Sequence, residues 1–528
     1  MKKRLPAILL ILAMIFVLVA CGNKTSESPA PSTAAEPSAT APSTANDVKY
    51  ADTIDIIAEG SFVAVGAQVT GATAVFNRVT NALIYDRLIN RMPDGSYIPQ
   101  LATSWDISDD LLTYTFKLRE GVNFHNGDKF NAQSVVDTLL AAKESTGSMG
   151  ADAWRLADSA KAIDEYTVEI SLAAVNVEFL YYLATPGAGI VNKAAIDANP
   201  VEGAWVGTGA YAVTGFVAGE YTELTRNEGY WGGEQPTRQL IIRWVPEATA
   251  RTIMMQNGET HMCLNIQPEE IPNFAADTAN YTVYSKLGNL SCSLDFNMGD
   301  PITGDKNFRL AVASAIDRAE IAEVASGQYG IPETGGTVWG YATEFRNNDI
   351  PIVPYDLDKA KEYLAASTYT GGEVELISGT PNHNRAAEII QEQLGKIGLT
   401  LRLFQTDPGT LSPYVIYDNN QAQMVHFVNP FTDTAASCRS VFYPGGASNK
   451  AAYNNPEVAA LLDLAPTILD RGEREKIYRQ IQELVADDLA YITTNYEVRN
   501  VVAVAAIGGI DTDPEQNHDF RGIYMTVD

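Results

Sequence analysis

The side chains best suited to catalysis or metal binding are few in this sequence and widely spaced. No two histidines stand four residues apart, and the sequence contains no serine-hydrolase elbow, phosphate-binding P-loop, zinc-protease motif or C-x-x-C pair. Acidic pairs such as Asp109–Asp110 fit a solvated surface in a chain with 65 acidic residues. We therefore predict that the protein is not an enzyme and holds no cofactor or metal. The histidines are His125, His261, His383, His426 and His518.

We expect the three cysteines after Cys21 to lie in the core. His261, Met262 and Cys263 can be read as a soft metal cluster, but on a strand Met262 would point away from the other two. A core cysteine beside a surface histidine is the favoured interpretation. Cys263, Cys292 and Cys438 are an odd number of widely spaced thiols, which favours buried free cysteines, although one disulfide among them stays open.

Cys21 differs from the other cysteines because it follows a segment typical of a signal peptide. Lys2, Lys3 and Arg4 precede an apolar run over residues 9–20 that is short for a membrane span. The sequence Leu-Val-Ala-Cys at 18–21 resembles the lipobox of bacterial lipoproteins, whose cysteine is diacylated and becomes the first mature residue. The alternative is an incidental cysteine in a plain signal peptide or anchor helix. We predict a signal peptide at 1–20 and lipidation at Cys21.

The segment after Cys21 is typical of a tether. Residues 22–47 are mostly Ser, Thr, Ala and Pro, without Leu, Ile, Val or aromatic residues, so they cannot bury enough apolar surface to fold. A flexible chain of this length reaches roughly 30 Å. We predict residues 21–47 to be a disordered tether that holds the protein on the outer face of the bacterial cell membrane.

Length and charge limit what the rest of the chain can be. The protein has 528 residues, 46% of them hydrophobic, which suffices for two or more domains. Its formal net charge of −28 repels phosphate backbones and anionic lipid, which argues against nucleic-acid binding and against direct membrane adhesion. No second long apolar stretch follows the leader, so we expect a soluble monomeric body.

Hydrophobic periodicity predicts a mixed α/β body. Residues 114–118 and 167–172 alternate apolar and polar positions as half-buried strands do, whereas 309–321 has helical spacing. Asp356 predicts a helix start before 357–364, and Asn455 with Pro456 predicts another before 457–464. Gly398 is placed to end a helix that contains Ile389, Ile390, Leu394 and Ile397.

A series of short motifs stands in a fixed order along the chain. The opening segment contains Y-D-R-L-I, P-D-G, P-Q-L-A-T-S-W and a long run that ends in F-H-N-G. It is followed by G-T-G-A-Y at 207–211 and R-N-E-G-Y-W at 226–231. Single motifs of this kind are weak, but their order over residues 52–500 resembles the peptide/nickel class, family 5, of extracellular solute-binding proteins of ABC importers. Most suit packing and turns, so they identify the fold and not the ligand.

The resemblance implies an α/β clamshell of two lobes with mixed sheets, which closes on a solute and then docks on a permease driven by its ATPase. Lobe one would comprise residues 48–285, with a subdomain at about 92–204, and the returning segment 490–528. Lobe two would comprise 286–489. The alternative is a retained binding-protein fold that serves as a sensor, a chaperone or a surface lipoprotein without a transport partner.

The ligand-binding segments depart from the family pattern. Peptide binders usually carry a W-x-x-D-Y-x-D-P-like segment whose first Asp accepts the peptide ammonium, but the corresponding stretch here begins at His426 and lacks the Trp and the D-P. Asp433 matches only with an insertion, and ungapped alignment places Pro430 there, beside Asn429. The arginine that receives the carboxylate in dipeptide binders is also missing from 377–383. The solute is therefore a peptide or another small polar or amphipathic molecule.

Five residues are the predicted ligand contacts. Ser61 and Phe62 follow the first strand, where relatives touch ligand, and Trp339 lies in a Gly-rich stretch that can present an aromatic wall. Asn429 and Asp433 occupy the altered ammonium-binding segment. The alternative for Trp339 is a buried loop anchor, and for Asp433 a helix cap or a surface acid.

Overall fold

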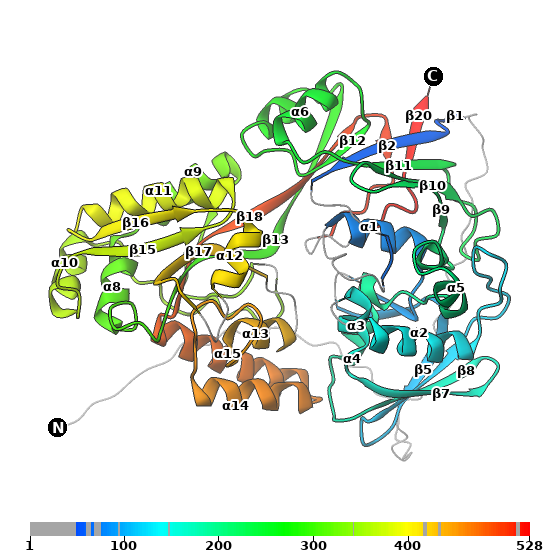
Figure 1. The fold of residues 1–528 in the computed structure, drawn as a ribbon, viewed down its shortest axis with the longest axis horizontal. Helices are drawn as coiled ribbons and strands as arrows, with labels where there is room; N and C mark the ends of the chain where they lie inside the picture. Colours follow the sequence, from blue (N-terminus) through cyan, green and yellow to red (C-terminus); the bar gives the residue numbers. More distant parts are fainter. Residues whose placement is uncertain are drawn as a thin grey trace, which may run out of the picture. The chain divides into compact units, whose positions relative to one another are not determined.

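The computed structural model combines helices with several sheets (Figure 1). It describes residues 49–527 apart from 60–64, 68–74, 93–94, 146–147, 342, 416–419, 431–434 and 514–517. The predicted leader, Cys21 and the tether lie outside these residues. None of the helices in the described ranges combines the length and the apolar composition that a membrane crossing requires.

One long mixed sheet carries most of the architecture. Strands β2 and β9–β12 form its first part, which we call the first lobe, and β15–β17 form the other part, the second lobe. Strands β13 and β18 belong to both, and β14 (Ile331–Pro332) pairs with β18. In spatial order the strands are β16 (Thr400–Gln405), β15 (Glu373–Ser378), β17 (Met424–Pro430), β13 (Tyr281–Phe296), β18 (Tyr491–Val504), β12 (Met262–Leu264), β2 (Thr53–Ala58), β11 (Gln239–Trp244), β10 (Tyr221–Arg226) and β9 (Tyr211–Val217).

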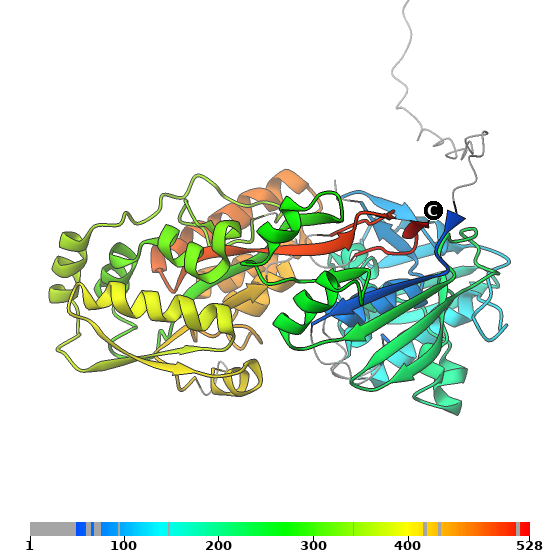
Figure 2. The same cartoon turned by 90° about the horizontal axis from the view of Figure 1, so that it is seen from above.

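The long antiparallel strands β13 and β18 are the connection between the lobes (Figure 2). Their pairing runs from Tyr281 opposite Val504 to Leu287 opposite Val498, and resumes at Ser291 opposite Tyr496. The residues of β13 between Leu287 and Ser291 therefore have no regular partner on β18, although Leu290 pairs with Pro430 of β17. A break of this kind bends the strands locally and weakens the ladder. The predicted lobe boundary at 285/286 lies close to this break and the one at 489/490 just before β18, and both stay predictions.

The second lobe packs helices on its part of the sheet. Its main core joins apolar faces of β15 and β17 to the helices α8–α11 (within residues 306–395), with Phe308, Ile390 and Leu394 fully buried. A second core lies among the later helices and includes Trp339 and Tyr478. The helices are α8 (Lys306–Ala315), α9 (Arg318–Ser326), α10 (Leu357–Ala366), α11 (Pro381–Gly395), α12 (Pro408–Tyr414), α13 (Ala435–Phe442), α14 (Pro456–Leu464) and α15 (Arg471–Asp488), with short 3₁₀ turns η3 (Gly327–Tyr329) and η5 (Ala465–Thr467).

Most predicted helix signals in this lobe are confirmed, and one is wrong. Asp356 and Asn455 cap α10 and α14, each accepting two backbone N–H groups through its side chain. The predicted helix 309–321 is instead split into α8 and α9, because Ile316 is extended and Asp317 caps a new helix by accepting from Ala319 and Glu320. Local capping thus overrides continuous helical periodicity. Helix α11 ends at Gly395, and Gly398 has φ of +86°.

The first lobe adds a smaller antiparallel sheet with its own core. Strands β6 and β8 confirm two predicted strands, and Phe116, Trp154 and Ile170 are buried between the sheet and the helices α2–α4. This sheet contains β5 (Ala102–Ile107), β6 (Thr113–Leu118), β8 (Thr167–Leu172) and β7 (Ala157–Asp164). Nearby are β3 (Ile89–Arg91), β4 (Tyr97–Pro99), α2 (Ala132–Glu144), α3 (Met149–Trp154), α4 (Phe179–Leu183), α5 (Lys193–Ala198), η1 (Pro186–Ala188) and η2 (Gly203–Trp205).

The remaining elements complete the first lobe on its long sheet. Helix α6 and helix α7 precede β12 and β13, and a small sheet joins the start of the described chain to its end. These elements are β1 (Lys49–Tyr50), β19 (Ile507–Gly508), β20 (Tyr524–Val527), α1 (Val75–Ile84), α6 (Ala248–Gln256) and α7 (Ile271–Ala276). The C-terminal segment is thus part of the first lobe.

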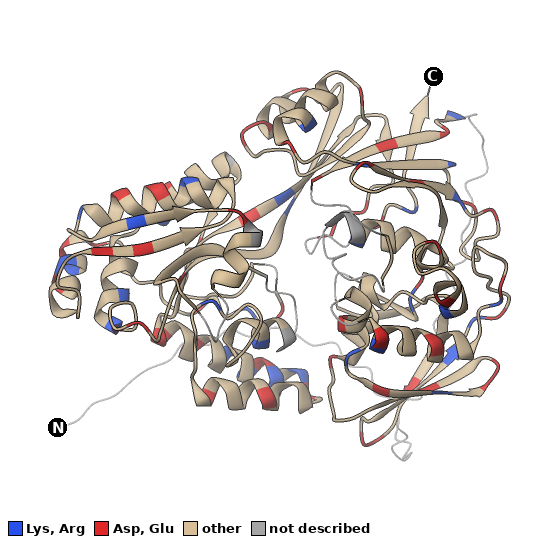
Figure 3. Ribbon diagram, viewed as in Figure 1, with Lys and Arg blue, Asp and Glu red and all other residues tan. Residues whose placement is uncertain are grey.

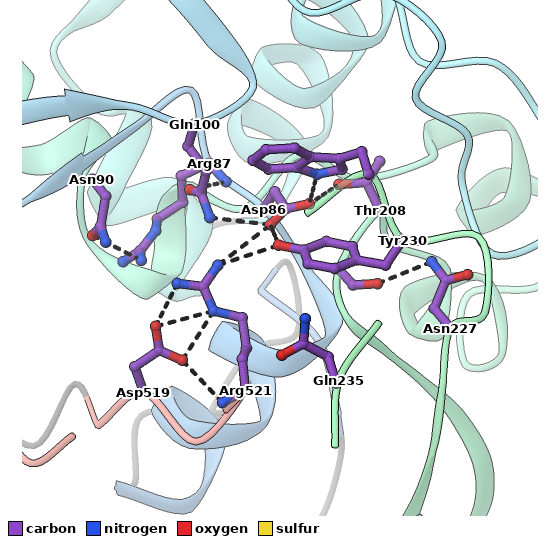
Figure 4. A network of polar contacts seen from close by, with 12 residues as sticks. Asp86, Arg87, Asn90, Gln100, Thr208, Asn227, Tyr230, Gln235, Asp519 and Arg521 are labelled. Carbon is purple, nitrogen blue, oxygen red and sulfur yellow. Dashed lines mark hydrogen bonds and ion pairs between the residues drawn. The ribbon is translucent and has the colours of Figure 1, made fainter. Parts of the chain in front are cut away.

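The sequence motifs of the first lobe meet at one buried carboxylate, that of Asp86 (Figure 4). Its Oδ1 accepts hydrogen bonds from Gln100 Nε2 and Tyr230 OH, each at 3.0 Å. Its Oδ2 accepts from Trp231 Nε1 at 2.7 Å and from Thr208 Oγ1 at 3.1 Å. The four donors come from the P-Q-L-A, G-T-G-A-Y and R-N-E-G-Y-W motifs, so motifs far apart in sequence serve one acceptor.

The C-terminal segment supplies the countercharge to this carboxylate. Arg521 Nη1 lies 3.8 Å from Asp86 Oδ1 and donates to Tyr230 OH at 3.3 Å. Burial raises the pKa of Asp86, and its hydrogen bonds and the Arg521 cation oppose that rise. Asp519 holds the Arg521 guanidinium in place with its own carboxylate. The buried charge therefore ties the end of the chain to the motifs of the first lobe.

Asp86→Ala should lower the free energy of unfolding by about 3–5 kcal/mol, because it leaves the buried donors and Arg521 without their acceptor. Asp86→Asn should lower the free energy of unfolding by less, since one acceptor oxygen remains. Urea denaturation measures both. The exposed Asp109→Ala is the control and should change stability by less than about 0.5 kcal/mol. A loss for Asp86→Ala as small as that of the control would contradict the network's role.

His518 makes the C-terminal segment sensitive to acid. Its ring stacks on Phe520, and its Nδ1 accepts the Asp513 N–H at 3.0 Å. Burial lowers the pKa of His518 to about 4. Because the unfolded chain binds this proton more tightly, the stability that neutral His518 contributes is present above pH about 6.5 and is lost as the pH falls toward 4.

Replacing His518 by Asn keeps an acceptor for Asp513 but removes the titration. The difference in unfolding free energy between the parent and His518→Asn should fall by about 3 kcal/mol between pH 7 and pH 4, from the pKa difference of roughly 2.5 units. Chemical denaturation at stepped pH measures this difference. A difference that is constant over that range would show that His518 is not held neutral.

Candidate functional site

A cavity at the crossing strands is lined by residues of both lobes. It has a volume of about 80 Å³ and is bordered by the end of β2, the segment after β12, the end of α9, the start of α11 and the middle of β18. Because β13 and β18 carry the chain between the lobes, a solute held here would touch both. The lining residues used below are Glu59, Arg251, Asn265, Ser326, Asn382, Glu497 and Arg499.

Charges of both signs face one another in this cavity, and Figure 3 shows charged residues along the crossing strands. Glu59 accepts from Asn265 Nδ2 at 2.9 Å and lies 3.4 Å from Arg251 Nη2 and 3.6 Å from Arg499 Nη1. Glu497 pairs with Arg499 Nη2 at 3.0 Å. The cavity therefore offers both carboxylates and guanidinium groups to a polar ligand.

A larger cavity, of about 430 Å³, lies entirely within the second lobe. It is bordered by the segment 333–353, helix α15 and the first residues of β18. Since the first lobe contributes nothing to its lining, closure between the lobes would not enclose a ligand there. We therefore take the smaller cavity at the crossing strands as the candidate solute site.

Asn429 lies at the end of β17 and is engaged by the protein's own side chains. Its Nδ2 donates to Ser293 Oγ at 2.7 Å, and its Oδ1 accepts from Lys450 Nζ at 2.5 Å. Lys450 Nζ also lies 3.8 Å from the buried Asp295 carboxylate. Burial raises the pKa of Asp295 to about 6, and Lys450 opposes the rise.

Lys450 gives this segment an ammonium group of its own. Lys450 is buried and hydrogen-bonded to Asn429 and to the Val428 carbonyl. The Asn429 oxygen is therefore already occupied. The Lys450–Asn429 contact lies in the segment where the sequence departs from the family pattern.

The other predicted contacts are placed differently. Trp339 is 2% exposed, stacks on Phe442 and donates from Nε1 to the Glu344 carbonyl at 3.1 Å. This is the loop-anchor alternative, within the second core of the second lobe. Ser61, Phe62 and Asp433 lie outside the described residues, although Glu59, two residues before Ser61, borders the cavity.

Sequence reasoning missed most of the charged cavity residues. Glu497 and Arg499 stand two apart on β18, so they share a face of a strand whose other residues are largely apolar, and that pattern was a usable signal. Arg251 and Asn265 gave no such signal, because a helix and a turn bring them to Glu59 from more than 190 positions away.

A buried polar cluster adjoins the cavity on the side of the second lobe. Cys292, His383 and His426 are buried, and the two imidazole rings lie 5.4 Å apart. Burial lowers the pKa of both histidines to about 3, so both rings are neutral. Burial also raises the pKa of the Cys292 thiol well above its usual value.

The three cysteines of the described residues agree with the sequence-based prediction. Cys263, Cys292 and Cys438 are free and buried. His261 Nδ1 accepts the Asp55 N–H at 2.9 Å, and the Cys263 thiol lies 3.7 Å from the Leu264 carbonyl. His261 and Cys263 thus have separate partners, and the interpretation of a core cysteine beside a more exposed histidine is confirmed.

Comparison with known proteins gives these features a context. Heme-binding protein A of Haemophilus influenzae is 26% identical over 496 residues, covering 83% of this chain and 86% of that protein. The glutathione-binding protein GsiB of Escherichia coli strain K12 is 26% identical over 413 residues, covering 74% and 79%.

Solved structures share the fold. The ABC transporter substrate-binding protein CtaP of Listeria monocytogenes superposes with a TM-score of 0.81 at 24% identity, covering 91% of this chain and all of that one. DppA of Helicobacter pylori in complex with the peptide STSA gives a TM-score of 0.78 at 22% identity, covering 91% and 99%. The α/β clamshell prediction is thereby confirmed. The model of the bacterial extracellular solute-binding proteins, family 5, matches residues 96–449, and the chain belongs to that family.

Proposed function

We propose that this protein is the membrane-anchored receptor of an ABC importer, which captures a small polar solute between its lobes and delivers it to the permease and its ATPase. Family membership gives extracellular solute binding. The observation that supports capture of a polar solute between the lobes is the cavity at the crossing strands, which has lining residues from both lobes and charges of both signs.

The solute we propose carries both charges, as a short peptide does. Carboxylates at Glu59 and Glu497 suit a ligand cation, and Arg251 and Arg499 suit a ligand carboxylate. Solved and curated relatives include proteins named for peptide, glutathione and heme binding. Among those chemistries, the polar lining favours the peptide-like one. Because Lys450 occupies Asn429, the ligand ammonium would be read by the cavity carboxylates instead.

Capture requires the lobes to move. Small-molecule sites typically enclose roughly 300–1,000 Å³, whereas this cavity has about 80 Å³. The irregular pairing of β13 with β18 near Ser291 is a suitable hinge. Away from the hinge, Tyr478 OH donates to Glu178 Oε1 at 3.0 Å, and Val177 N–H donates to the Pro466 carbonyl at 2.9 Å. These contacts would break when the lobes separate and form again on closure.

Native mass spectrometry of protein purified without refolding should reveal a bound solute as a defined added mass. Adding that solute back to stripped protein should raise the melting temperature by mass action and reduce the radius of gyration in small-angle scattering. Glu59→Gln should weaken the affinity at least tenfold, about 1.4 kcal/mol, with Asp109→Asn as the unchanged control. Unchanged scattering at verified saturation would contradict closure, and unchanged affinity for Glu59→Gln would remove the cavity as the site.

The lipid anchor is tested separately. We expect Cys21→Ser to abolish acylation, because the diacylglycerol is carried by the thiol, and so to leave the protein unprocessed or released from the membrane. Stable anchoring needs more than one acyl chain, at about 0.8 kcal/mol per buried CH₂. Fractionation and mass analysis of the mature N-terminus measure this. Processed Cys21→Ser protein that stays with the membrane as the parent does would exclude the lipoprotein interpretation.

A further inference from the structure

Three potential metal ligands from separate elements converge beside the cavity. They are the thiol of Cys292 on β13, the imidazole of His383 in the first turn of α11, and the carboxylate of Glu497 on β18. The distances are 3.5 Å from Sγ to Nε2, 3.9 Å from Sγ to Oε1 and 3.6 Å from Nε2 to Oε1. The three atoms thus form a nearly equilateral triangle.

The two contacts of the Cys292 sulfur are within the range of sulfur hydrogen bonds, whereas the distance between His383 Nε2 and Glu497 Oε1 suits a shared ion better than a direct hydrogen bond. The 3.6 Å separation of Nε2 and Oε1 exceeds the 2.7–3.2 Å range of an ordinary N–H···O bond. A tetrahedral Zn²⁺ with its usual bond lengths to sulfur, nitrogen and oxygen holds such ligand atoms about 3.4–3.6 Å apart. Only the Sγ–Oε1 edge is longer than that. An ion at the centre therefore requires little movement of the side chains.

The surrounding groups orient the ligands. His383 Nδ1 lies 2.6 Å from Thr380 Oγ1, the N-cap residue of α11, so donation from Nδ1 to this hydroxyl directs the Nε2 lone pair toward Cys292 and Glu497. Arg499 pairs with Glu497 Oε2 at 3.0 Å, which leaves Oε1 for the site. Metal-binding histidines and carboxylates are usually held by such outer partners.

The ligand set selects the kind of ion. A thiolate and an imidazole with one carboxylate suit Zn²⁺ and similar borderline-soft ions, whereas Mg²⁺ and Ca²⁺ prefer oxygen ligands alone. Three protein ligands leave a fourth position open. Glu497 also lines the cavity at the crossing strands, so the ion would lie at the border of that cavity.

We propose that Cys292, His383 and Glu497 form a three-ligand binding site for Zn²⁺ or a similar borderline-soft divalent ion, with its fourth position open to water. No spacing pattern in the sequence points to this site, because the three residues are 91 and 114 positions apart. The site shares Glu497 with the cavity proposed for the solute, but its three ligands all come from the protein, so metal binding does not require the solute.

Titration of the reduced, chelator-stripped full chain with Co²⁺ tests the site. The parent should bind about one equivalent with a thiolate-to-cobalt charge-transfer band, and added Zn²⁺ should displace it. Cys292→Ser should lose the band, whereas Cys438→Ser, which removes another buried thiol, should retain it. No saturable band in the parent, or a band undiminished in Cys292→Ser, would overturn the proposal.

Competition with a chromophoric chelator measures the Zn²⁺ affinity. It also allows the site to be tested with variants of the other two ligands. Glu497→Gln and His383→Gln should weaken Zn²⁺ binding at least tenfold, with His426→Gln as the neighbouring control within about twofold. Circular dichroism checks folding, and if Cys292→Ser is unfolded, the half-buried Glu497→Gln decides. Affinity within twofold of the parent for Glu497→Gln would overturn the site. Native mass spectrometry of the metal-stripped chain shows whether the solute still binds. This measurement tests the solute proposal separately from the metal site.

Discussion

The burial of the Asp86 charge is the constraint on which the first lobe depends. A carboxylate without access to water is tolerated only when hydrogen bonds and a countercharge replace its hydration. Here four donors and Arg521 supply that replacement, and they come from three motifs and from the C-terminal segment. Each motif is thus fixed in position relative to the others, and the end of the chain must return to the first lobe to complete the set.

The second constraint is the continuity of the long sheet. Hydrogen bonding along β13 and β18 keeps both lobes in one sheet, yet the ladder is irregular between Leu287 and Ser291. The regular parts are stiff because their backbone groups are paired, and the irregular part can bend at lower cost. Glu497 and Arg499 lie close to this irregularity. The charged cavity therefore lies at the irregular part of the ladder that connects the lobes.

The polar interior of the second lobe shows how the ligand site can change while the fold persists. Lys450, Asn429 and Asp295 satisfy one another in the segment where the sequence departs from the family pattern. The same strands place Cys292, His383 and Glu497 around a common centre. Both arrangements use positions that point into the sheet's interior and leave the strand pairing intact. Ligand chemistry is therefore carried by a few side chains on a scaffold that other residues determine.

Local sequence determined the elements and their order. Caps at Asp356 and Asn455, the alternation of β6 and β8, and the series of motifs depend on neighbouring residues, so they were predictable without a structure. The split between α8 and α9 was not, because the capping strength of Asp317 competes with a continuous helical pattern and only the packed helices show which effect prevails.

Only the tertiary structure decided which residues meet. The partners of Asp86, the Lys450–Asn429 contact and the Cys292–His383–Glu497 group all join segments separated by tens to hundreds of positions. Sequence patterns report which face of an element is buried, but not which residue of another element lies opposite. For that reason Trp339, a plausible cavity aromatic by sequence, is a core residue, and Glu59 and Arg499 are the side chains that line the cavity.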